Sequence, residues 1–343
     1  MSPSAALGEF IAGLPKAELH VHHVGSASPR IVAELASRHP DTPVPTTPEQ
    51  VVDYFRFTDF AHFVTVYVSV VDLVRTPEDV RMLTYEIARE MAAQQIRYAE
   101  LTCSPYTSVL AGVPAPAFCE AIEDARSAAE RDFGLVLRWC FDIPGELGIP
   151  AARETLRIAT ELAPDGLVSF GLGGPEIGVP RPQFKEYFDR ARAEGLRSVP
   201  HAGETTGPQT IWDALNELGA ERIGHGTSAT ADPRLLEHLV SEQVPLEVCP
   251  TSNIATGAVK VLADHPIIAM YEAGVAVTVN SDDPPMFNTT LNREYEVAAD
   301  LLRLDRAGVA ELAAVAVRAS FAPAEVKTRV LAEIDEHLSR AGS

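Results

Sequence analysis

The chain has 343 residues, of which 46% are hydrophobic and 22% charged, and 28 basic and 48 acidic residues give it a formal net charge of −20. So strong a negative charge argues against nucleic acid or an anionic membrane as partner, since both require a cationic face. No apolar run approaches the roughly 18 residues that a membrane-spanning helix needs. The length permits either one large barrel or two smaller domains.

The four cysteines are far apart in the sequence and form no CxxC pair: Cys103, Cys119, Cys140 and Cys249. This distribution is typical of reduced thiols in a cytoplasm. Residues 1–13 carry no positive cluster before their short apolar stretch, so we expect no secretory signal. We therefore expect a cytoplasmic protein.

Short apolar strands alternate with alanine-rich helical stretches, and no sequence repeat is visible. The expected strands are Ala17–Val21, Ile96–Leu101, Leu135–Phe141, Leu167–Leu172, Arg197–Pro200, Arg222–Gly224, Pro245–Val248 and Val275–Val279. The expected helices between them include Glu78–Gln94, Pro116–Asp132, Ala151–Leu162, Pro208–Leu218 and Asp232–Ser241. This alternation predicts parallel βαβ units, and eight strands are the number that closes a TIM-type (β/α)8 barrel.

A barrel of this type typically needs about 250 residues, fewer than this chain has. The surplus falls in an insertion after the first strand, residues 27–75, and in a tail after Pro284. We expect one barrel domain over residues 1–343.

The active site of such a barrel is built at the C-terminal ends of its strands. Polar residues suited to catalysis follow six of the expected strands in this sequence. They lie at His20 and His22, in the segment Gly171–Glu176, at His201 and Glu204, at His225, in Thr251–Asn253 and at Asp282–Asp283.

His20 and His22 are two residues apart, so on a strand both side chains face the barrel interior. Two buried imidazoles are costly unless a metal ion or good acceptors satisfy them. Barrel closure would bring Asp282 beside them, and with His201 they make a ligand set that suits a zinc-type divalent ion with an open position for water. Alternatively, Asp282 and Asp283 form only a turn or a helix cap.

Bound zinc lowers the pKa of its water to about 7 and supplies hydroxide at neutral pH. Glu204 is placed to give a proton to the substrate, and His225 could accept one from the water or stabilise the developing charge. The structural alternatives are a satisfied core pair of His201 and Glu204, and a tight turn at His225. Gly174 and its neighbour would let a backbone N–H approach a ligand closely. These residues predict metal-assisted hydrolysis without naming a substrate.

Four segments carry a resemblance to a known family: Pro15–His22, His201–Glu204, Ile223–Gly226 and Ser281–Pro284. In this order they resemble the adenosine deaminase family of metal-dependent amidohydrolases, over most of the chain. Leu291–Tyr295 and Ala319–Phe321 resemble its extra C-terminal helices. The H-x-E and P-C-x-x-C signature of the cytidine-deaminase type is absent.

The resemblance implies one Zn2+ ion per chain, held by His20, His22, His201 and Asp282. It implies that Glu204 donates a proton to purine N1 and that His225 orients or deprotonates the attacking water. It further implies that Asp283 bonds N7 and that the Gly174 backbone N–H bonds N3. Ammonia and a 6-oxopurine would be the products.

Three departures from the family pattern concern the substrate. Val24 stands where the family usually has an acid that binds ribose hydroxyls, including the one at the 5′ position, and valine accepts no hydrogen bond. A buried hydroxyl left unpaired costs about 1–3 kcal/mol. Thr102 replaces an arginine of many members, and Gly171 replaces an aspartate. We therefore expect an adenosine-like nucleoside with a bulkier, partly apolar group at its 5′ carbon.

The branch of the family that deaminates 6-amino-6-deoxyfutalosine, in the futalosine route to menaquinone, fits this expectation, because that substrate bears a ketone-linked benzoate. The resemblance also implies that residues 27–75 form a helical lid over the pocket. Its segment Phe55–Phe63 is rich in aromatic residues and supplies Arg56 and Phe60 as candidate substrate contacts. Alternatively, the aromatic residues belong to the core and Arg56 is a solvated charge.

Other functions stay open. Plain adenosine deaminase, converting adenosine to inosine, is the first alternative. A catalytically dead relative is disfavoured by the intact ligands and Glu204, and an amidohydrolase of non-purine amides or esters by Asp283 and Gly174. We expect a small-molecule nucleoside as partner, and neither nucleic acid nor a membrane. The sequence does not indicate the oligomeric state.

Overall fold

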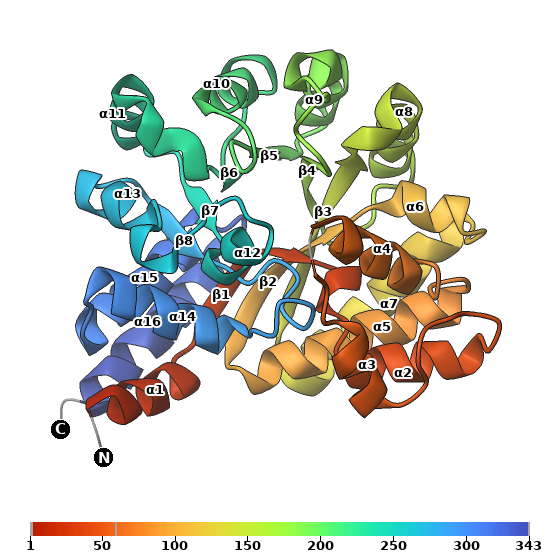
Figure 1. Ribbon diagram of the computed structural model, residues 1–343, viewed down its shortest axis with the longest axis horizontal. Coiled ribbons are helices and arrows are strands. Elements are labelled where there is room, and N and C mark those ends of the chain that lie inside the picture. Colours follow the sequence, from red (N-terminus) through yellow and green to blue (C-terminus); the bar gives the residue numbers. More distant parts are fainter. Residues whose placement is uncertain (1–2, 59, 342–343) are drawn as a thin grey trace.

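The computed structural model describes residues 3–58 and 60–341, without the side chains of residues 3, 4, 60 and 61. Its sheet has eight strands in the order β1 to β8, and the paired neighbours are parallel (Figure 1). The strands are β1 Lys16–His22, β2 Ile96–Cys103, β3 Val136–Pro144, β4 Leu167–Gly173, β5 Arg197–Ala202, β6 Ile223–His225, β7 Leu246–Val248 and β8 Val277–Val279. The predicted TIM-type barrel is confirmed.

Helices surround these strands (Figure 1). Between strands lie α5 Pro77–Ala93, α6 Pro105–Leu110, α7 Ala115–Phe133, α8 Gly148–Arg157, α9 Lys185–Ala193, α10 Pro208–Glu217, α11 Pro233–Ser241, α12 Pro250–Ala255 and α13 Ile267–Ala273. Local sequence explains their bounds: Thr76 forms a capping box at the start of α5, and Gly134 ends α7 in a left-handed conformation. The helix expected over Ala151–Leu162 ends in a π-helical turn, Ile158–Leu162.

The two regions of surplus sequence are helical. The insertion contains α2 Pro29–Arg38, α3 Pro48–Tyr54 and α4 Phe60–Val71, and the ends of the chain contain α1 Pro3–Gly13, α14 Leu291–Leu302, α15 Arg306–Ala319 and α16 Ala324–Ala341. The expected extra helices are therefore present in both regions. No helix in the described part of the chain is long and apolar enough to cross a membrane.

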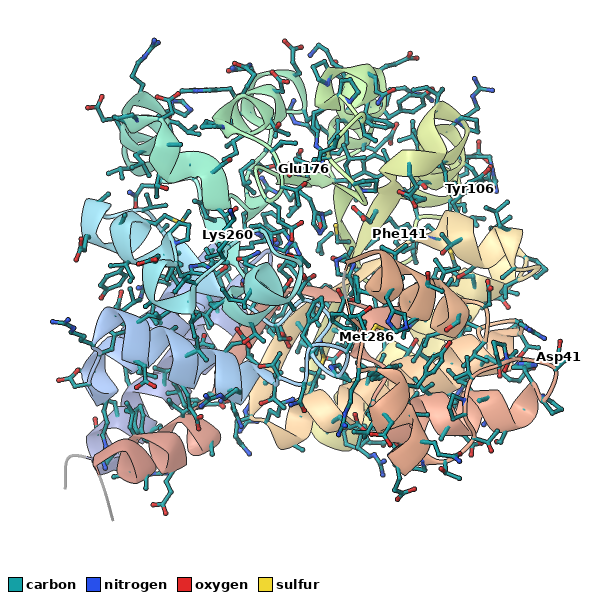
Figure 2. All side chains as sticks on the ribbon, in the orientation of Figure 1. Asp41, Tyr106, Phe141, Glu176, Lys260 and Met286 are labelled. Carbon is teal, nitrogen blue, oxygen red and sulfur yellow. The ribbon has the colours of Figure 1, made fainter. Side chains whose placement is uncertain are left out.

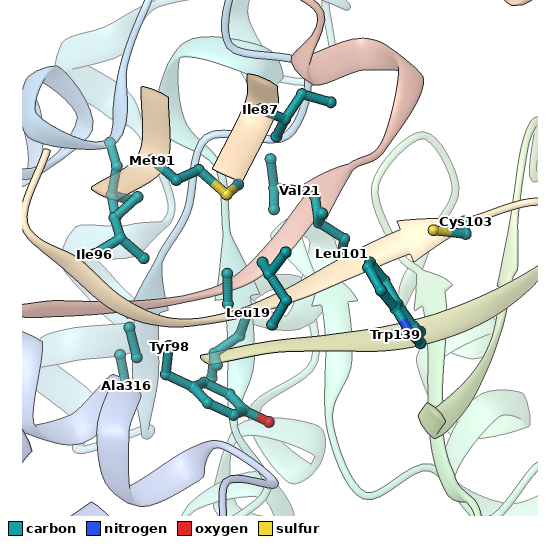
Figure 3. Packing of buried hydrophobic residues seen from close by; sticks show 14 of the residues in the cluster. Leu19, Val21, Ile87, Met91, Ile96, Tyr98, Leu101, Cys103, Trp139 and Ala316 are labelled. Atoms are coloured by element: carbon teal, nitrogen blue, oxygen red, sulfur yellow. The ribbon is translucent and has the colours of Figure 1, made fainter. Parts of the chain in front are cut away.

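The core lies between the barrel strands and the helices around them. Leu19, Leu101 and Trp139, from the first three strands, are almost fully buried (Figure 3). Ile87 of α5 and Ala316 of α15 belong to the same cluster. Burying an aliphatic side chain of this size contributes about 1.5–3 kcal/mol, so the sheet is held in place chiefly by these contacts.

The barrel closes where the first and last strands end. Val21 and Asp282 form a parallel bridge. The His22 backbone N–H donates to the Asp282 carbonyl at 2.9 Å, and the Asp282 N–H donates to the His20 carbonyl at 3.2 Å. Closure therefore places Asp282 directly beside the two histidines of β1, as the predicted barrel requires.

An aromatic cluster joins the insertion to the loop after β8. The ring centroid of Phe63 on α4 lies 5.2 Å from that of Phe57 and 5.0 Å from that of Phe287. Phe287 belongs to the loop that leads from Asp282 to α14, so the insertion packs against the segment that carries the strand-eight site residues.

Candidate active site

Four side chains converge at the mouth of the barrel. One ligand atom from each of His20, His22, His201 and Asp282 lies within 4.8 Å of the other three. The Nε2 atoms of His22 and His201 are 3.3 Å apart, and Oδ1 of Asp282 lies 3.1 Å from Nε2 of His22 and 3.5 Å from Nε2 of His20. The structure thus brings together all four predicted metal ligands.

Neighbouring groups orient the imidazoles. Nδ1 of His20 lies 2.9 Å from the Glu247 carboxylate, and Nδ1 of His201 lies 3.0 Å from the Leu172 carbonyl. A carboxylate or carbonyl fixes the proton on Nδ1 and leaves Nε2 free to bind a metal ion. Arg222 pairs with Glu247 at 2.5 Å and so holds this support in place.

Two polar atoms of the cluster test whether a metal ion fits. Nε2 of His20 and Oδ1 of Asp282 are buried and have no hydrogen-bond partner among the described residues. Orphaned buried atoms of this kind are costly, and a cation bound between them would satisfy both. Burial opposes ionisation of Asp282, but its close contacts with the His20 and His22 rings hold its pKa well below the usual range, so it can serve as an anionic ligand. The residues fit a divalent ion.

A second set of potential ligands overlaps the first. His225 and Cys249 lie close enough to His20 and Asp282 to form an alternative group. Burial raises the pKa of the Cys249 thiol well above its usual value, which disfavours the thiolate that a metal ion requires. The set of three histidines and Asp282 is therefore the better site.

His225 and Asp282 share an uncommon backbone conformation. Their φ angles are 62° and 65°, in the left-handed region that residues other than glycine seldom adopt. Such conformations cost of order 1–3 kcal/mol and concentrate at functional sites. Here they turn each side chain, at its strand end, toward the ligand cluster.

Glu204 faces the same cluster from the loop after β5. Its Oε2 lies 3.7 Å from Nε2 of His225, and its Oε1 accepts a hydrogen bond from Thr256 at 3.2 Å. Burial, followed by the charges of Asp282 and Glu176, raises the pKa of Glu204 to about 8. The carboxyl group can therefore hold a proton at neutral pH and donate it.

Glu176 organises that loop from the segment after β4 (labelled in Figure 2). Its carboxylate accepts backbone hydrogen bonds from Gly203 at 2.6 Å, Thr205 at 2.5 Å and Thr206 at 3.1 Å. Three donors on one carboxylate fix the path of the chain on both sides of Glu204. The position of Glu204 is thus set by contacts outside the metal cluster.

The residues expected to bind a purine lie close by. A Cβ atom at Gly25 would lie 1.6 Å from Oδ1 of Asp283, so only glycine admits this carboxyl group. That oxygen is buried and has no hydrogen-bond partner among the described residues. Burial and the charge of Asp282 raise the pKa of Asp283. Gly174 has a φ angle of 76°, which suits glycine and turns its backbone at the end of β4.

The remaining predicted contacts are less closely tied to the cluster. Val24 is half-buried in the 3-10 turn after β1. The Arg56 side chain is 77% exposed and pairs with Asp53 at 3.4 Å, at the edge of a 550 Å³ cavity that Ser281 also lines. Phe60 begins α4, and its side chain is outside the described residues. Roles for Arg56 and Phe60 in substrate binding stay predictions.

Two acids near the site were not predicted. Glu247 supports His20, and Asp142 on β3 is buried with Oδ1 unpaired among the described residues. The Ser252 hydroxyl, within the predicted strand-end segment Thr251–Asn253, donates to Asp282 at 2.6 Å. Glu247 lies between Leu246 and Val248 in β7, and Asp142 lies between Phe141 and Ile143 in β3. That pattern was the available signal, because a buried charge requires a partner.

Fold and site together define a metal-dependent hydrolase: a (β/α)8 barrel with a three-histidine, one-aspartate cluster and an adjacent acid. The family model described as adenosine deaminase matches residues 15–337. The chain belongs to the adenosine deaminase family, whose members are metal-dependent hydrolytic deaminases.

Individual relatives agree with this assignment. Over 333 residues the chain is 68% identical to an aminodeoxyfutalosine deaminase of Streptomyces avermitilis, covering 96% of this chain and 93% of that protein. It is 38% identical over 344 residues to an adenine deaminase of Cupriavidus necator, covering 99% and 96%. The crystal structure of an adenine deaminase from Arthrobacter aurescens matches with a TM-score of 0.89 at 32% identity, covering 95% of this chain and 99% of that one.

Proposed function

We propose that the protein removes the 6-amino group of an adenosine-like nucleoside by hydrolysis and that its substrate is 6-amino-6-deoxyfutalosine, an intermediate of menaquinone biosynthesis. The observation that carries the proposal is the 68% identity to an aminodeoxyfutalosine deaminase over almost the whole of both chains. Val24 supports it, because a valine there suits a substrate that lacks the 5′ hydroxyl. Plain adenosine deamination is the alternative, and the more distant relationship to an adenine deaminase, at 38% identity, fits an unmodified purine substrate.

We propose Zn2+ as the metal ion, with His20, His22, His201 and Asp282 as its ligands. Three imidazoles and one carboxylate are typical of catalytic zinc, with a position left for water. The ion would lower the pKa of that water toward 7 and so supply hydroxide at neutral pH.

The surrounding residues bind and polarise the purine. Glu204 holds a proton at neutral pH and gives it to N1, which makes C6 more electrophilic. Purine N7 accepts hydrogen bonds, so Asp283 must be protonated to bond it, and its raised pKa supports that state. The Gly174 backbone N–H donates to N3.

The 5′ group lies toward the insertion, residues 27–75, which serves as a lid. The cluster of Phe57, Phe63 and Phe287 offers apolar surface where the insertion meets the loop after β8. Arg56 and Phe60 are the proposed contacts for the carboxylate and ring of a benzoate. The four cysteines are free thiols, which supports the cytoplasm as the compartment.

An ammonia-release assay over a panel of 6-aminopurines tests the proposal. We expect kcat/KM for aminodeoxyfutalosine to exceed that for adenosine and for adenine by more than about tenfold, a ratio that one unpaired polar group can produce. Turnover of adenosine within about tenfold of the larger nucleoside would support the alternative instead. Glu204→Gln is the control, because it should keep the metal ion and lose turnover.

A further inference from the structure

A chain of hydrogen bonds leads from a backbone amide to His225 through two buried side chains. The Ile267 backbone N–H donates to Nδ1 of His265 at 3.1 Å. Nε2 of His265 lies 3.3 Å from Oδ1 of Asn253, and Nδ2 of Asn253 lies 3.1 Å from Nδ1 of His225. His265, Asn253 and His225 are each no more than 1% exposed, so water does not compete for these contacts.

The first group in the chain sets the direction of every bond. A backbone N–H can only donate, so Nδ1 of His265 is an acceptor and the proton of this imidazole is on Nε2. That N–H donates to Oδ1 of Asn253, which orients the amide with its NH2 group toward His225. The amide NH2 can only donate, so Nδ1 of His225 is an acceptor and Nε2 carries the proton.

Nε2 of His225 faces the reaction site. It lies 3.7 Å from Oε2 of Glu204 and 3.9 Å from Oδ2 of Asp282, too far for a direct hydrogen bond but close enough for all three groups to contact one oxygen atom beside them. Both neighbours are carboxyl groups that offer lone pairs. His225 therefore directs its Nε2–H into this space, and the hydrogen bonds that begin at the Ile267 backbone fix the proton there.

We propose that Asn253 and His265 are positioning residues that fix the His225 tautomer with its proton on Nε2. In this tautomer His225 donates a hydrogen bond that holds the attacking oxygen and stabilises its charge, and it does not remove a proton from that oxygen. The inference rests on the proposed function for its chemistry. The tautomer itself is a property of the protein and can be measured without substrate, so the two can fail separately.

Nitrogen NMR of protein labelled with 15N-histidine tests the tautomer directly. We expect the His225 signals, identified by their loss in His225→Gln, to show a neutral ring protonated at Nε2, with and without Zn2+. The Asn253→Asp variant differs only at the amide nitrogen and cannot donate as a carboxylate, so it should move the proton to Nδ1. A His225 proton on Nδ1 in the wild type, or a His225 proton that stays on Nε2 in Asn253→Asp, would overturn the proposal.

Kinetics of the same variant separate a donor from a base. Loss of one preorganised donor to a developing oxyanion costs about 10²–10³ in kcat, so we expect Asn253→Asp to lose about 100-fold in kcat with KM within about threefold and one metal ion retained. If His225 instead removed a proton, exposing its Nε2 lone pair would preserve or raise kcat. An unchanged or raised kcat with the proton moved would therefore contradict the proposal.

His265 provides an independent pair of variants. His265→Gln keeps a side-chain N–H that can donate to Asn253, whereas His265→Leu leaves the amide free to reverse. We expect His265→Leu to lower kcat at least about tenfold more than His265→Gln does. We also expect His265→Leu to show a mixture of the two His225 tautomers. His39→Leu is the control, since His39 bonds Asp79 at 2.8 Å in a different part of the molecule. Equal losses in the two His265 variants would refute a positioning role.

Discussion

Asp142 on β3 and Gly171 on β4 are direct register partners, and the carboxylate of one fills the space that a side chain at the other would need. A Cβ atom at Gly171 would lie 2.6 Å from Oδ1 of Asp142, and one at Gly173 would lie 2.2 Å from its Oδ2. The resemblance to the family implies an aspartate where this chain has Gly171. We infer that Asp142 supplies, from the adjacent strand, the carboxylate that Gly171 lacks.

This exchange predicts strong coupling between the two positions. Gly171→Ala should lower the melting temperature and weaken metal retention, because overpacking a buried site costs about 1–3 kcal/mol. Asp142→Gly combined with Gly171→Asp should recover more metal content than either single variant. Metal analysis and thermal unfolding of the wild type, Asp142→Gly, Gly171→Asp and the double variant measure this coupling. Gly207→Ala is the matched control, since nothing lies within 4 Å of a Cβ atom there. Additive losses in the double variant would contradict the exchange.

Glu204 should make the stability of the metal-free protein depend on pH. Its pKa rises from 4.5 to about 8, chiefly through burial. A carboxyl group whose pKa is raised in the folded protein contributes stability that is fully present below the pKa it has in the unfolded chain. This stability is lost as the pH rises through the pKa that the group has in the folded protein. Metal-free Glu204→Gln should therefore melt a few degrees above the wild type at about pH 9 and close to it at about pH 4.5. Calorimetry of both proteins checks this, and a constant difference across that range would disprove it.

The contact between Gly25 and Asp283 predicts a selective loss of catalysis. Gly25→Ala places a methyl group where Oδ1 of Asp283 now lies, so the carboxyl group must move by more than an ångström. A displacement of this size can cost about 100-fold in rate. We expect kcat/KM to fall by about that factor while one metal ion stays bound. Loss of the metal ion together with activity would show instead that Gly25 supports the ligand cluster.

Val24 should control the choice between nucleosides. Val24→Asp supplies the acceptor that a 5′ hydroxyl needs and places a charge near the modified 5′ group. We expect the ratio of kcat/KM for adenosine to that for aminodeoxyfutalosine to rise at least about tenfold. Val24→Ala is the control, because it enlarges the pocket without adding an acceptor. An equal rise in both variants would point to space, not hydrogen bonding, as the cause.

The sequence predicts the barrel and its metal ligands because both depend on local pattern. Strand and helix periods reveal the eight βα units, and the strand-end rule then selects His20, His201 and Asp282 without knowledge of which strands pair. Even β7 and β8, of three residues each, are found, since their apolar runs are flanked by clear helices.

What the sequence does not predict depends on contacts between distant strands and loops. Glu247 supports His20 only because both side chains point into the barrel, from β7 and β1. Asp142 lies beside Gly171 only through the register of β3 with β4. The alignment of His265 with Asn253 likewise requires the fold of the loop after α12. Lateral register and loop paths of this kind leave no periodic signal.

X-ray absorption of the zinc-loaded protein tests the central claim most directly: one ion held by three imidazoles and the Asp282 carboxylate. We expect a first shell of nitrogen and oxygen at about 2.0–2.1 Å with imidazole scattering beyond it, unchanged in Cys249→Ser. A sulfur neighbour at about 2.3 Å that disappears in Cys249→Ser would assign the ion to the alternative set with His225 and contradict the account.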